Sequence, residues 1–377
     1  MKARYSPWWM PLSIVLLLAC CLILFVLLVK QTAEQKPAIN QVEQGEQKAQ
    51  YEWKLVTSWP KNFPGLGLAP ETFARYVNEM SGGRLKIHVY GAREIVGPLE
   101  VFDAVSAGSV EMGHSGAYYW KGKIPASVFF TSVPFGMNAQ SYNAWLHYGD
   151  GLKLWREAYA PFNLVPFAGG NTGVQMGGWF NREINTVEDL RGLKMRIPGL
   201  GGEVFSRAGG IAQNIPGGEL YTSLQTGVID ATEWVGPYND LAFGFHQIAE
   251  YYYYPGWHEP GPGLEFIANK QKLEALPKDL QKIIEVAARA TNQDMLDEYT
   301  ANNNRSLQEL IKKHNVDVRP FPKDVLLTLK KYADEIYAEQ AAKDPLFAKV
   351  YESYKAFLLD SRDYMKISEE AYYQLPE

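Results

Sequence analysis

Residues able to bind a small charged molecule lie at two points in the middle of the chain where predicted strands end. At the first, Arg196 lies in KMRIPGLGG, between an apolar strand and a glycine-rich turn. An arginine at this position is either a surface charge or a buried fork that matches the two oxygens of a carboxylate. The glycines and the start of the next helix add backbone N–H groups that favour an anion nearby. Arg196 is therefore the first candidate for binding a carboxylate.

The second point is the stretch IDATEWVGP at residues 229–237, where Glu233 stands beside the apolar Trp234. A carboxylate half-buried against an indole is costly unless a cation, a hydrogen-bond donor or a ligand compensates its charge. Gln175, in a predicted strand, is either an ordinary polar residue or a neutral oxygen ligand. Glu233 and Gln175 are therefore candidate ligands of a hard cation.

Signatures of catalysis are missing from the sequence. GHSGA at residues 113–117 lacks the second glycine of a nucleophile elbow in the right place, and no Walker loop or GxGxxG spacing occurs. The six histidines form no HExxH pair. In the rigid aromatic loop PGWHEPGPG, His258 and Glu259 either cap the loop or serve a metal-dependent hydrolase or lyase. We do not expect an enzyme, and turnover of a bound ligand would distinguish that alternative.

The composition favours a small-molecule binding protein over a nucleic-acid-binding one. A chain of 377 residues is long enough for two domains with well-filled cores. The formal net charge is −5 and no basic run occurs, so we expect no nucleic-acid partner. Aromatic residues reach 13%, and although most such rings fill cores, they also line small-molecule clefts.

The N-terminal segment indicates export. Lys2 and Arg4 precede Pro11–Val29, a run of 19 uncharged residues, which is near the length that spans a bilayer. Basic residues in front of such a run place the N-terminus in the cytoplasm. No small-x-small cleavage site follows, so an uncleaved anchor over residues 1–30 is favoured over a cleaved signal peptide. LLAC at residues 17–20 leaves a lipoprotein as a third alternative. Both cysteines of the chain lie inside the apolar run, so disulfides are excluded from the exported part.

The rest of the chain is predicted to form a two-lobed α/β protein. Residues 31–50, rich in Gln and Glu, are typical of a flexible linker. Residues 51–170 follow a β-α-β-α-β pattern and form the first lobe, and residues 171–263 form a second lobe of the same kind. The remainder is mostly helical: residues 264–320 complete the first lobe, and residues 321–377 form C-terminal helices. An apolar stripe in these helices packs on the chain's own lobes or, alternatively, on a partner subunit.

Two segments, one in each lobe, resemble each other. LEVFDAVSAGSVEMGHS and GELYTSLQTGVIDATEW superimpose at an offset of 119 residues, so that Gly108 matches Gly227 and His114 matches Glu233. Two interpretations fit: chance similarity of amphipathic helix–glycine–strand units, or two lobes built alike. Because ligands of open α/β sheets bind beyond the carboxyl ends of strands, the second interpretation places both segments at one cleft. Only one lobe would then supply the charged ligand of a metal.

Several motifs, in order along the chain, resemble the extracytoplasmic solute-binding proteins of TRAP transporters. They are GAREIVGPLEVFDAVSAGSVEMG, YYWKGKIPASVFFTSVPFGM, DLRGLKMRIPG and LYTSLQTGVIDATEW. MRIPGLGGEVFSRAGG, ATEWVGPYND and YYYYPGWHEPG are similar to the branch of this family that binds 2-oxo acids and lactate. The similarity runs from about Tyr51 to the C-terminus, and the long N-terminal anchor departs from the family's usual cleaved signal.

The resemblance implies a role for each candidate residue. The arginine of the MRIPG motif, here Arg196, is the family's carboxylate clamp. In the 2-oxo acid branch, Gln175, Glu233 and the main-chain oxygen of Trp234 hold a metal ion that also touches the substrate carboxylate. Glu259 is implied as a further contact of the substrate and the metal.

On the side of the first lobe, the resemblance implies that Tyr118 and Tyr119 close the pocket. The chemistry agrees with these roles, because a monocarboxylate with a vicinal oxygen chelates a hard cation, and oxygen ligands suit Na⁺ or Ca²⁺ rather than Zn²⁺. One arginine and one cation set against the substrate carboxylate and Glu233 come close to neutrality, as a dry cleft requires.

We therefore predict a periplasmic solute-binding subunit of a TRAP transporter, tethered by its N-terminal anchor. Its fold class is a two-lobed, periplasmic-binding-protein-like α/β fold with a hinge and long C-terminal helices. It captures a small 2-oxo or 2-hydroxy monocarboxylate such as pyruvate or lactate and delivers it to the membrane permease. The alternatives are a TRAP-type binding protein for another organic acid or a polyol, and a sensory or scaffold role. The resemblance also allows a homodimer through the C-terminal helices.

Overall fold

The computed structural model describes four stretches of the chain, residues 18–19, 22–27, 30 and 50–376. The chain divides into two units, residues 1–47 and 48–377, and the α/β fold lies in the second. The predicted anchor at residues 1–30 and the predicted linker at residues 31–50 fall largely outside the described residues. None of the helices described in the structure combines the length and the apolar character needed to cross a membrane.

The first lobe contains a five-stranded sheet with the strand order β2-β1-β3-β10-β4. Its strands are β1 (Tyr51–Thr57), β2 (Leu85–Tyr90), β3 (Met112–Ser115), β4 (Leu164–Asn171) and β10 (Gly263–Asn269). β1 runs parallel to β2 and β3, whereas β10 runs antiparallel to β3 and β4. The first part of β1 alternates between its two faces, because Trp53 and Leu55 are buried while Glu52 and Lys54 are exposed.

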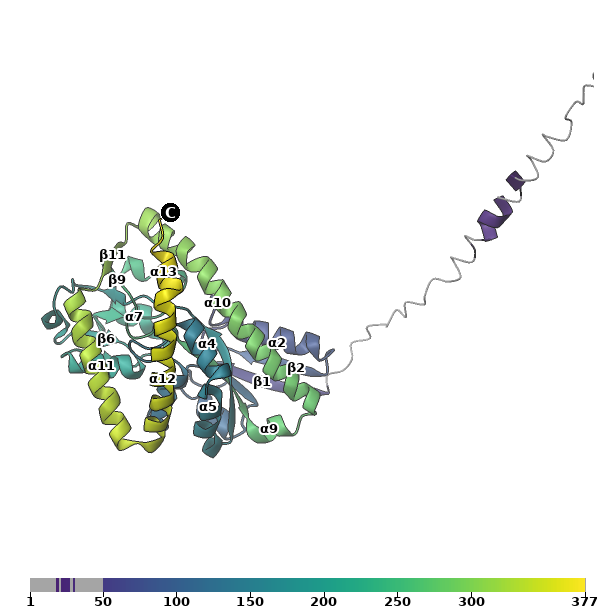
Figure 1. The fold of residues 1–377 in the computed structure, drawn as a ribbon, viewed down its shortest axis with the longest axis horizontal. Coiled ribbons are helices and arrows are strands. Elements are labelled where there is room, and N and C mark those ends of the chain that lie inside the picture. Colours follow the sequence, from purple (N-terminus) through teal and green to yellow (C-terminus); the bar gives the residue numbers. More distant parts are fainter. Residues whose placement is uncertain (1–17, 20–21, 28–29, 31–49, 377) are drawn as a thin grey trace, which may run out of the picture. The chain divides into compact units, whose positions relative to one another are not determined.

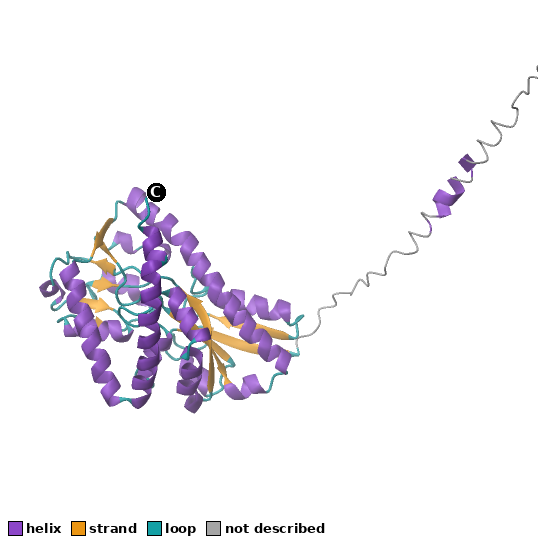
Figure 2. Ribbon diagram, viewed as in Figure 1, coloured by secondary structure: helices purple, strands orange, loops and turns teal. Residues whose placement is uncertain are grey.

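The second lobe contains a six-stranded sheet with the strand order β11-β9-β5-β8-β6-β7, and Figure 2 shows the two sheets as separate groups of strands. Its strands are β5 (Gly178–Phe180), β6 (Lys194–Arg196), β7 (Ile211–Gln213), β8 (Ala231–Thr232), β9 (Tyr251–Tyr254) and β11 (Asp317–Pro320). β6 runs parallel to β7 and β8, whereas β5 runs antiparallel to β8 and β9. β11 extends the sheet by pairing in parallel with β9.

The two sheets have the same topology, apart from β11. Strands β7, β6, β8, β5 and β9 correspond in order and direction to β2, β1, β3, β10 and β4. The helices before β3 and β8, α3 (Val101–Ser106) and α7 (Leu220–Gln225), occupy matched residues at the 119-residue offset. Gly108 and Gly227, which follow them, both have φ of +74°, a conformation that favours glycine. This agreement supports two lobes built alike rather than a chance similarity.

Helices cover the faces of both sheets. The remaining α-helices of the sheet-bearing regions are α2 (Leu68–Met80), α4 (Ala139–Tyr148), α5 (Gly151–Tyr159), α6 (Gly199–Arg207), α8 (Pro237–Phe243) and α9 (Lys270–Glu274). Short 3₁₀ helices are η1 (Ala117–Trp120), η2 (Pro125–Phe130), η3 (Ala160–Phe162), η4 (Val187–Leu190), η5 (Gly217–Glu219) and η6 (Phe245–Gln247). α2, for example, packs on β2 and buries Phe73 and Val77, which lie on one face of the helix.

Long helices connect the two lobes. α10 (Lys278–His314) packs against β4 and α2 of the first lobe and against α8 of the second, and Figure 1 shows it running diagonally along the fold. α11 (Lys323–Lys343) packs on α6 of the second lobe, whereas α12 (Pro345–Ile367) packs on α4 and α5 of the first. The short α13 (Glu369–Tyr373) follows. The predicted apolar stripe of α11 is buried within this chain, at Val325, Leu329, Ala333, Ile336 and Tyr337.

Candidate functional site

Neighbouring parallel strands of the second sheet bring Arg196 and Glu233 together. Arg196 is the last residue of β6, and Glu233 follows directly after β8, whose Thr232 pairs in register with Arg196. The main-chain N–H of Glu233 donates to the main-chain oxygen of Arg196 at 3.3 Å. Because parallel strands end at the same edge of a sheet, both side chains enter the space beyond the carboxyl ends, where ligands of such sheets bind.

The Arg196 side chain is a buried fork. It has 1% of its surface exposed, as does Glu233. Its Nη1 donates to the Glu233 carboxylate and, at 3.3 Å, to the Glu233 main-chain oxygen. Its Nε donates to the main-chain oxygen of Ile215 at 3.1 Å, and its Nη2 donates to the Tyr119 hydroxyl at 3.2 Å. This burial excludes a surface charge, and the binding of a ligand carboxylate by Arg196 stays a prediction.

Arg196 keeps its positive charge in the buried site. Burial lowers the pKa of Arg196, but Glu233 and the other acidic groups nearby raise it further, so the net pKa lies above its ordinary value. The guanidinium also lies over the Trp234 ring, 5.0 Å from its centre. A buried ion pair contributes little to stability by itself, because the cost of desolvating two charges offsets their attraction. The arrangement therefore calls for an explanation in binding.

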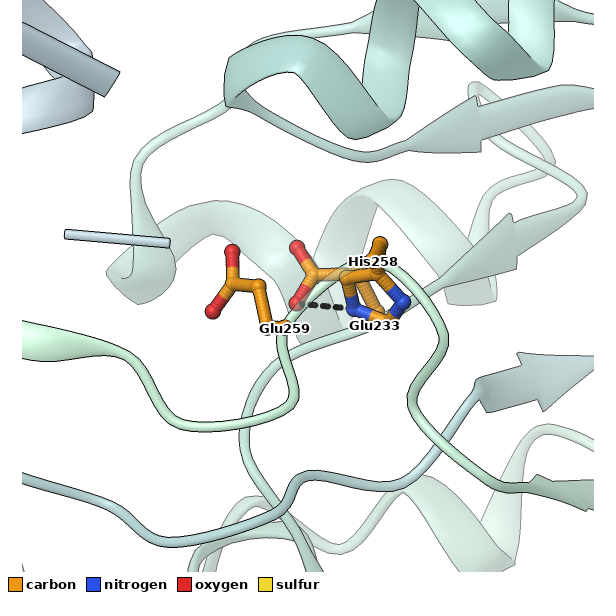
Figure 3. A group of neighbouring side chains, drawn as sticks. All are labelled: Glu233, His258 and Glu259. Carbon is orange, nitrogen blue, oxygen red and sulfur yellow. Dashed lines mark hydrogen bonds and ion pairs between the residues drawn. The ribbon is translucent and has the colours of Figure 1, made fainter. Parts of the chain in front are cut away.

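The loop between β9 and β10 brings two more ionisable side chains to Glu233. Figure 3 shows His258 and Glu259 grouped with Glu233, and Nε2 of His258 lies 3.4 Å from Oε2 of Glu233. All three residues are buried, and each offers a ligand atom within 4.8 Å of the others. The loop is fixed by main-chain hydrogen bonds to Gln175, one from Gly256 at 2.8 Å and one to the Glu259 oxygen at 3.2 Å. The sequence indicates His258 as a loop cap or, alternatively, as part of a metal-dependent enzyme, and it does not predict the approach of His258 to Glu233.

Gln175 lies in a loop, and its prediction as a strand residue is wrong. β5 begins at Gly178, because the backbone of Gln175 pairs with the loop around Glu259 instead of with a neighbouring strand. The side-chain Nε2 of Gln175 donates to the Thr172 hydroxyl at 3.2 Å. The side-chain oxygen of Gln175 has no hydrogen-bond partner within residues 50–376, and Gln175 lines the pocket described below.

Three buried polar atoms of this region have no hydrogen-bond partner within residues 50–376. They are Oε1 of Gln175, Nε1 of Trp234 and Nδ1 of His258. A buried polar atom without a partner costs about 1–3 kcal/mol, so such atoms are rare in native proteins. Three of them around one ion pair indicate a place where a polar ligand belongs.

The residues present fit a hard cation. Gln175 offers a neutral oxygen, and Glu233 and Glu259 offer carboxylates, which are the donors that Na⁺ and Ca²⁺ prefer. Burial first, and the charge of Glu233 second, raise the pKa of Glu259 well above its ordinary value, against the lowering effect of Arg196. A cation beside Glu259 would oppose both effects and keep its carboxylate ionised.

The opposite wall of the site comes from the first lobe. Tyr118 and Tyr119 lie in η1, directly beyond the carboxyl end of β3, with their ring centroids 4.6 Å apart. Burial raises the pKa of both hydroxyls, which are therefore neutral. The hydroxyl of Tyr119 accepts the hydrogen bond from Arg196 across the gap between the lobes.

A small cavity of about 20 Å³ lies between these walls, which is room for about one water molecule. Six of the predicted site residues line it: Tyr118, Tyr119, Gln175, Arg196, Trp234 and Glu259. Glu233 joins them through its contact with Arg196. Their roles in binding remain predictions. The sequence does not single out the other lining residues, because most of them are apolar and resemble ordinary core residues. They are Trp59, Leu66, Thr172, Val235, Pro262 and Leu264.

The sequence matches a known family over most of its length. Residues 55–344 match the DctP family, described as bacterial extracellular solute-binding protein, family 7. A monocarboxylate 2-oxoacid-binding periplasmic protein of Nostoc sp. is 47% identical over 320 residues, which cover 85% of this chain and 87% of that protein.

Solved structures agree with this match. A TRAP periplasmic solute-binding protein of Pseudoalteromonas atlantica, crystallised with sodium and pyruvate, is 47% identical with a TM-score of 0.85, covering 87% of this chain and 99% of its own. Another, from Colwellia psychrerythraea with calcium and pyruvate, is 48% identical with a TM-score of 0.84, covering 85% and 98%. The predicted fold class is confirmed, and so is the predicted family. The chain therefore belongs to the DctP family, family 7 of the bacterial extracellular solute-binding proteins that serve TRAP transporters.

Proposed function

We propose that this protein captures a small 2-oxo or 2-hydroxy monocarboxylate, such as pyruvate or lactate, together with Na⁺ or Ca²⁺, and delivers it to a TRAP permease. One observation carries the proposal. A buried Arg196–Glu233 ion pair is surrounded by three buried polar atoms that have no partner within residues 50–376. The related proteins that bind pyruvate with sodium or with calcium support the same substrate class.

Arg196 is the carboxylate clamp in this proposal. Its guanidinium has five N–H donors, and its contacts with Glu233, Tyr119 and Ile215 fix the plane of the fork from three sides. A fork held in this way loses little side-chain entropy when a carboxylate arrives, which favours tight and oriented binding. The neighbouring Tyr118 covers the ligand from the first lobe.

Oxygen donors near Arg196 would hold the cation. Gln175 and Glu259 supply oxygens from two loops that are hydrogen-bonded to each other, and Glu233 and the Trp234 main-chain oxygen supply the others. When bound, the cation supplies positive charge to the ligand carboxylate and its vicinal oxygen. That charge balances the carboxylates of a site from which water is excluded.

The lining of the cavity favours a ligand with a short apolar end. Leu66, Val235 and Leu264 form apolar walls that suit a methyl group and oppose a second charge or a chain of hydroxyls. A monocarboxylate with a short alkyl tail therefore fits better than a sugar acid or a polyol.

We place the first lobe at residues 51–170 with 264–320, and the second at residues 171–263, with residues 321–377 as C-terminal helices. The lobes close on the ligand by a hinge, and the protein releases its ligand unchanged, without turnover.

The protein acts in the periplasm, tethered through residues 1–30. Exposed apolar side chains on α12 and α13, including Ile367 and Tyr373, suit a homodimer contact.

A thermal-shift panel tests the proposed function. Pyruvate, lactate, a dicarboxylate, a sugar acid and a polyol are each added with Na⁺, with Ca²⁺ or with a chelator. A ligand at 100 times its Kd stabilises the folded state by about 2.7 kcal/mol, so a clear rise in Tm is expected for pyruvate and lactate with a cation. A larger rise with the sugar acid or the polyol would redirect the proposal to that substrate, and no rise with any acid would reject it.

A further inference from the structure

Glu259 is a buried carboxyl group that no basic side chain within residues 50–376 pairs with. Arg196 and Glu233 neutralise each other, each with 1% of its side chain exposed. Glu259 is also buried, at 6% exposure, and no lysine, arginine or histidine within residues 50–376 forms a salt bridge with it. Gln175, its neighbour through the main-chain hydrogen bond at 3.2 Å, is neutral.

The charge count changes when a monocarboxylate enters. When a bound cation keeps Glu259 ionised, the ligand, Glu233 and Glu259 carry three negative charges, against one positive charge on Arg196. The balance is −2, which a divalent cation cancels and a monovalent cation cancels only by half. Uncompensated charge in a buried site is costly because the surroundings screen it poorly. With a neutral residue at position 259 the balance would be −1, which suits a monovalent cation.

Resting on the proposed function, we propose that Glu259 is the residue that selects the charge of the cation, making the site prefer Ca²⁺ over Na⁺. Glu233 cannot take this role alone, because its charge is already paired with Arg196. Gln175 contributes an oxygen but no charge. Glu259 therefore acts on which cation accompanies the ligand, whereas Arg196 acts on whether a carboxylate binds at all.

The test is calorimetric titration of pyruvate into the full chain at about pH 8. The only added cation is either Na⁺ or Ca²⁺. In the wild-type protein, pyruvate should bind more tightly with Ca²⁺. In Glu259→Gln, the affinity with Ca²⁺ should fall by about 100-fold or more relative to that with Na⁺, reversing the preference. Glu157→Gln, which alters an exposed carboxylate paired with Lys349, is the matched control and should change neither value.

A charge-relocation variant separates charge from position. Gln175→Glu combined with Glu259→Gln keeps the same groups but moves the carboxylate to the neighbouring loop, and it should restore the preference for Ca²⁺. A Ca²⁺ preference that persists in Glu259→Gln would overturn the inference. An equal loss with both cations would also overturn it, because Glu259 would then be a shared contact. Thermal unfolding of each variant shows whether it folds. If wild-type protein fails to bind pyruvate with either cation, the proposed function fails instead.

Discussion

Matched positions of the two lobes carry different kinds of residue. Where the second lobe has Glu233, the first has His114. Where β6 ends in Arg196, the matched position of β1 is Val56, because Arg196 pairs with Thr232 and Val56 pairs with Gly113 at the 119-residue offset. Both lobes thus present buried side chains at the same edge of the same topology, but only the second presents an ion pair there. A common scaffold has been divided into one lobe that carries the charges and one that covers them.

The hydrogen bonds of the two matched residues show the same division. His114 accepts a hydrogen bond at Nδ1 from Trp59 Nε1 at 2.8 Å, and its Nε2 lies 3.0 Å from the Gly169 oxygen. Burial lowers its pKa to about 4, so it is neutral and both ring nitrogens are satisfied. Around Glu233, by contrast, His258 keeps a buried nitrogen without a partner among the described residues. At these positions the histidine of the first lobe is fully satisfied, whereas the histidine beside Glu233 is not.

Each lobe also buries a carboxyl group that accepts hydrogen bonds from one indole and one tyrosine. The donors are Trp120 and Tyr159 for Glu265, and Trp179 and Tyr252 for Asp240. Burial raises the pKa of both carboxyls to about 7. Because both are satisfied within their own lobe, they are structural groups, and a buried acid alone does not identify the site.

Replacing the arginine should have the largest effect. Arg196→Lys keeps the charge but removes the planar fork, so pyruvate binding should weaken by about 4 kcal/mol, or roughly 1000-fold. Isothermal titration calorimetry measures the change. Arg207→Lys makes the same substitution in α6, where the arginine pairs with the exposed Glu339, and should leave affinity unchanged. Similar affinities for Arg196→Lys and wild type would remove Arg196 from the site.

Exchanging the acid should affect stability as well as cation dependence. Glu233→Gln leaves Arg196 buried without its carboxylate, which should lower the free energy of unfolding by about 4 kcal/mol. It should also weaken the dependence of pyruvate binding on added cation. His114→Gln, at the matched position, should retain that dependence. Denaturant unfolding and calorimetry check both variants, and equal cation dependence in Glu233→Gln and wild type would contradict the proposed division between the lobes.

The pH dependence of stability distinguishes the lobes too. The pKa of His114 lies at about 4 in the folded state, below its ordinary 6.5, so the unfolded chain takes up the proton first as the pH falls. The wild-type protein should therefore lose up to about 3 kcal/mol between pH 6.5 and 4 relative to His114→Gln, which keeps a donor and an acceptor but does not titrate. Denaturant unfolding at several pH values measures this difference. A constant difference across the window would show that His114 is not held neutral by burial.

Breaking an exposed ion pair between the two lobes should have the smallest effect on pyruvate binding. Lys121 of the first lobe pairs with Glu203 of the second at 2.9 Å. Their side chains are 37% and 34% exposed. Exposed pairs contribute about 0–1 kcal/mol, so Lys121→Gln should weaken pyruvate binding by no more than about five-fold. A loss as large as that expected for Arg196→Lys would show that binding depends on the Lys121–Glu203 pair as strongly as on the buried ion pair.

Local patterns predict much of this fold. Alternation gives β1, the apolar helical face gives α2, and the repeated helix–glycine–strand unit gives the equivalence of the lobes. Arg196 and Glu233 are predictable because strong local signals, an apolar strand followed by a turn, place them at the same sheet edge. The family motifs add their expected roles.

The rest of the site depends on contacts between distant segments. Gln175 faces the pocket because its backbone bonds to the loop at residues 255–262, and the same bonds bring His258 to Glu233. Leu66 and Leu264 line the cavity, yet their sequence surroundings are those of core residues. Such features follow from the packing of separate loops and not from any periodic pattern, so the sequence of one segment does not contain them.

The central claim is that the second lobe holds a monocarboxylate between Arg196 and a cation. The most direct measurement is a titration of pyruvate into ion-depleted wild-type protein, followed by the same titration after adding Ca²⁺. The account predicts weak or undetectable heat without the cation and tight one-to-one binding with it. Equally tight binding in the ion-depleted protein would contradict it.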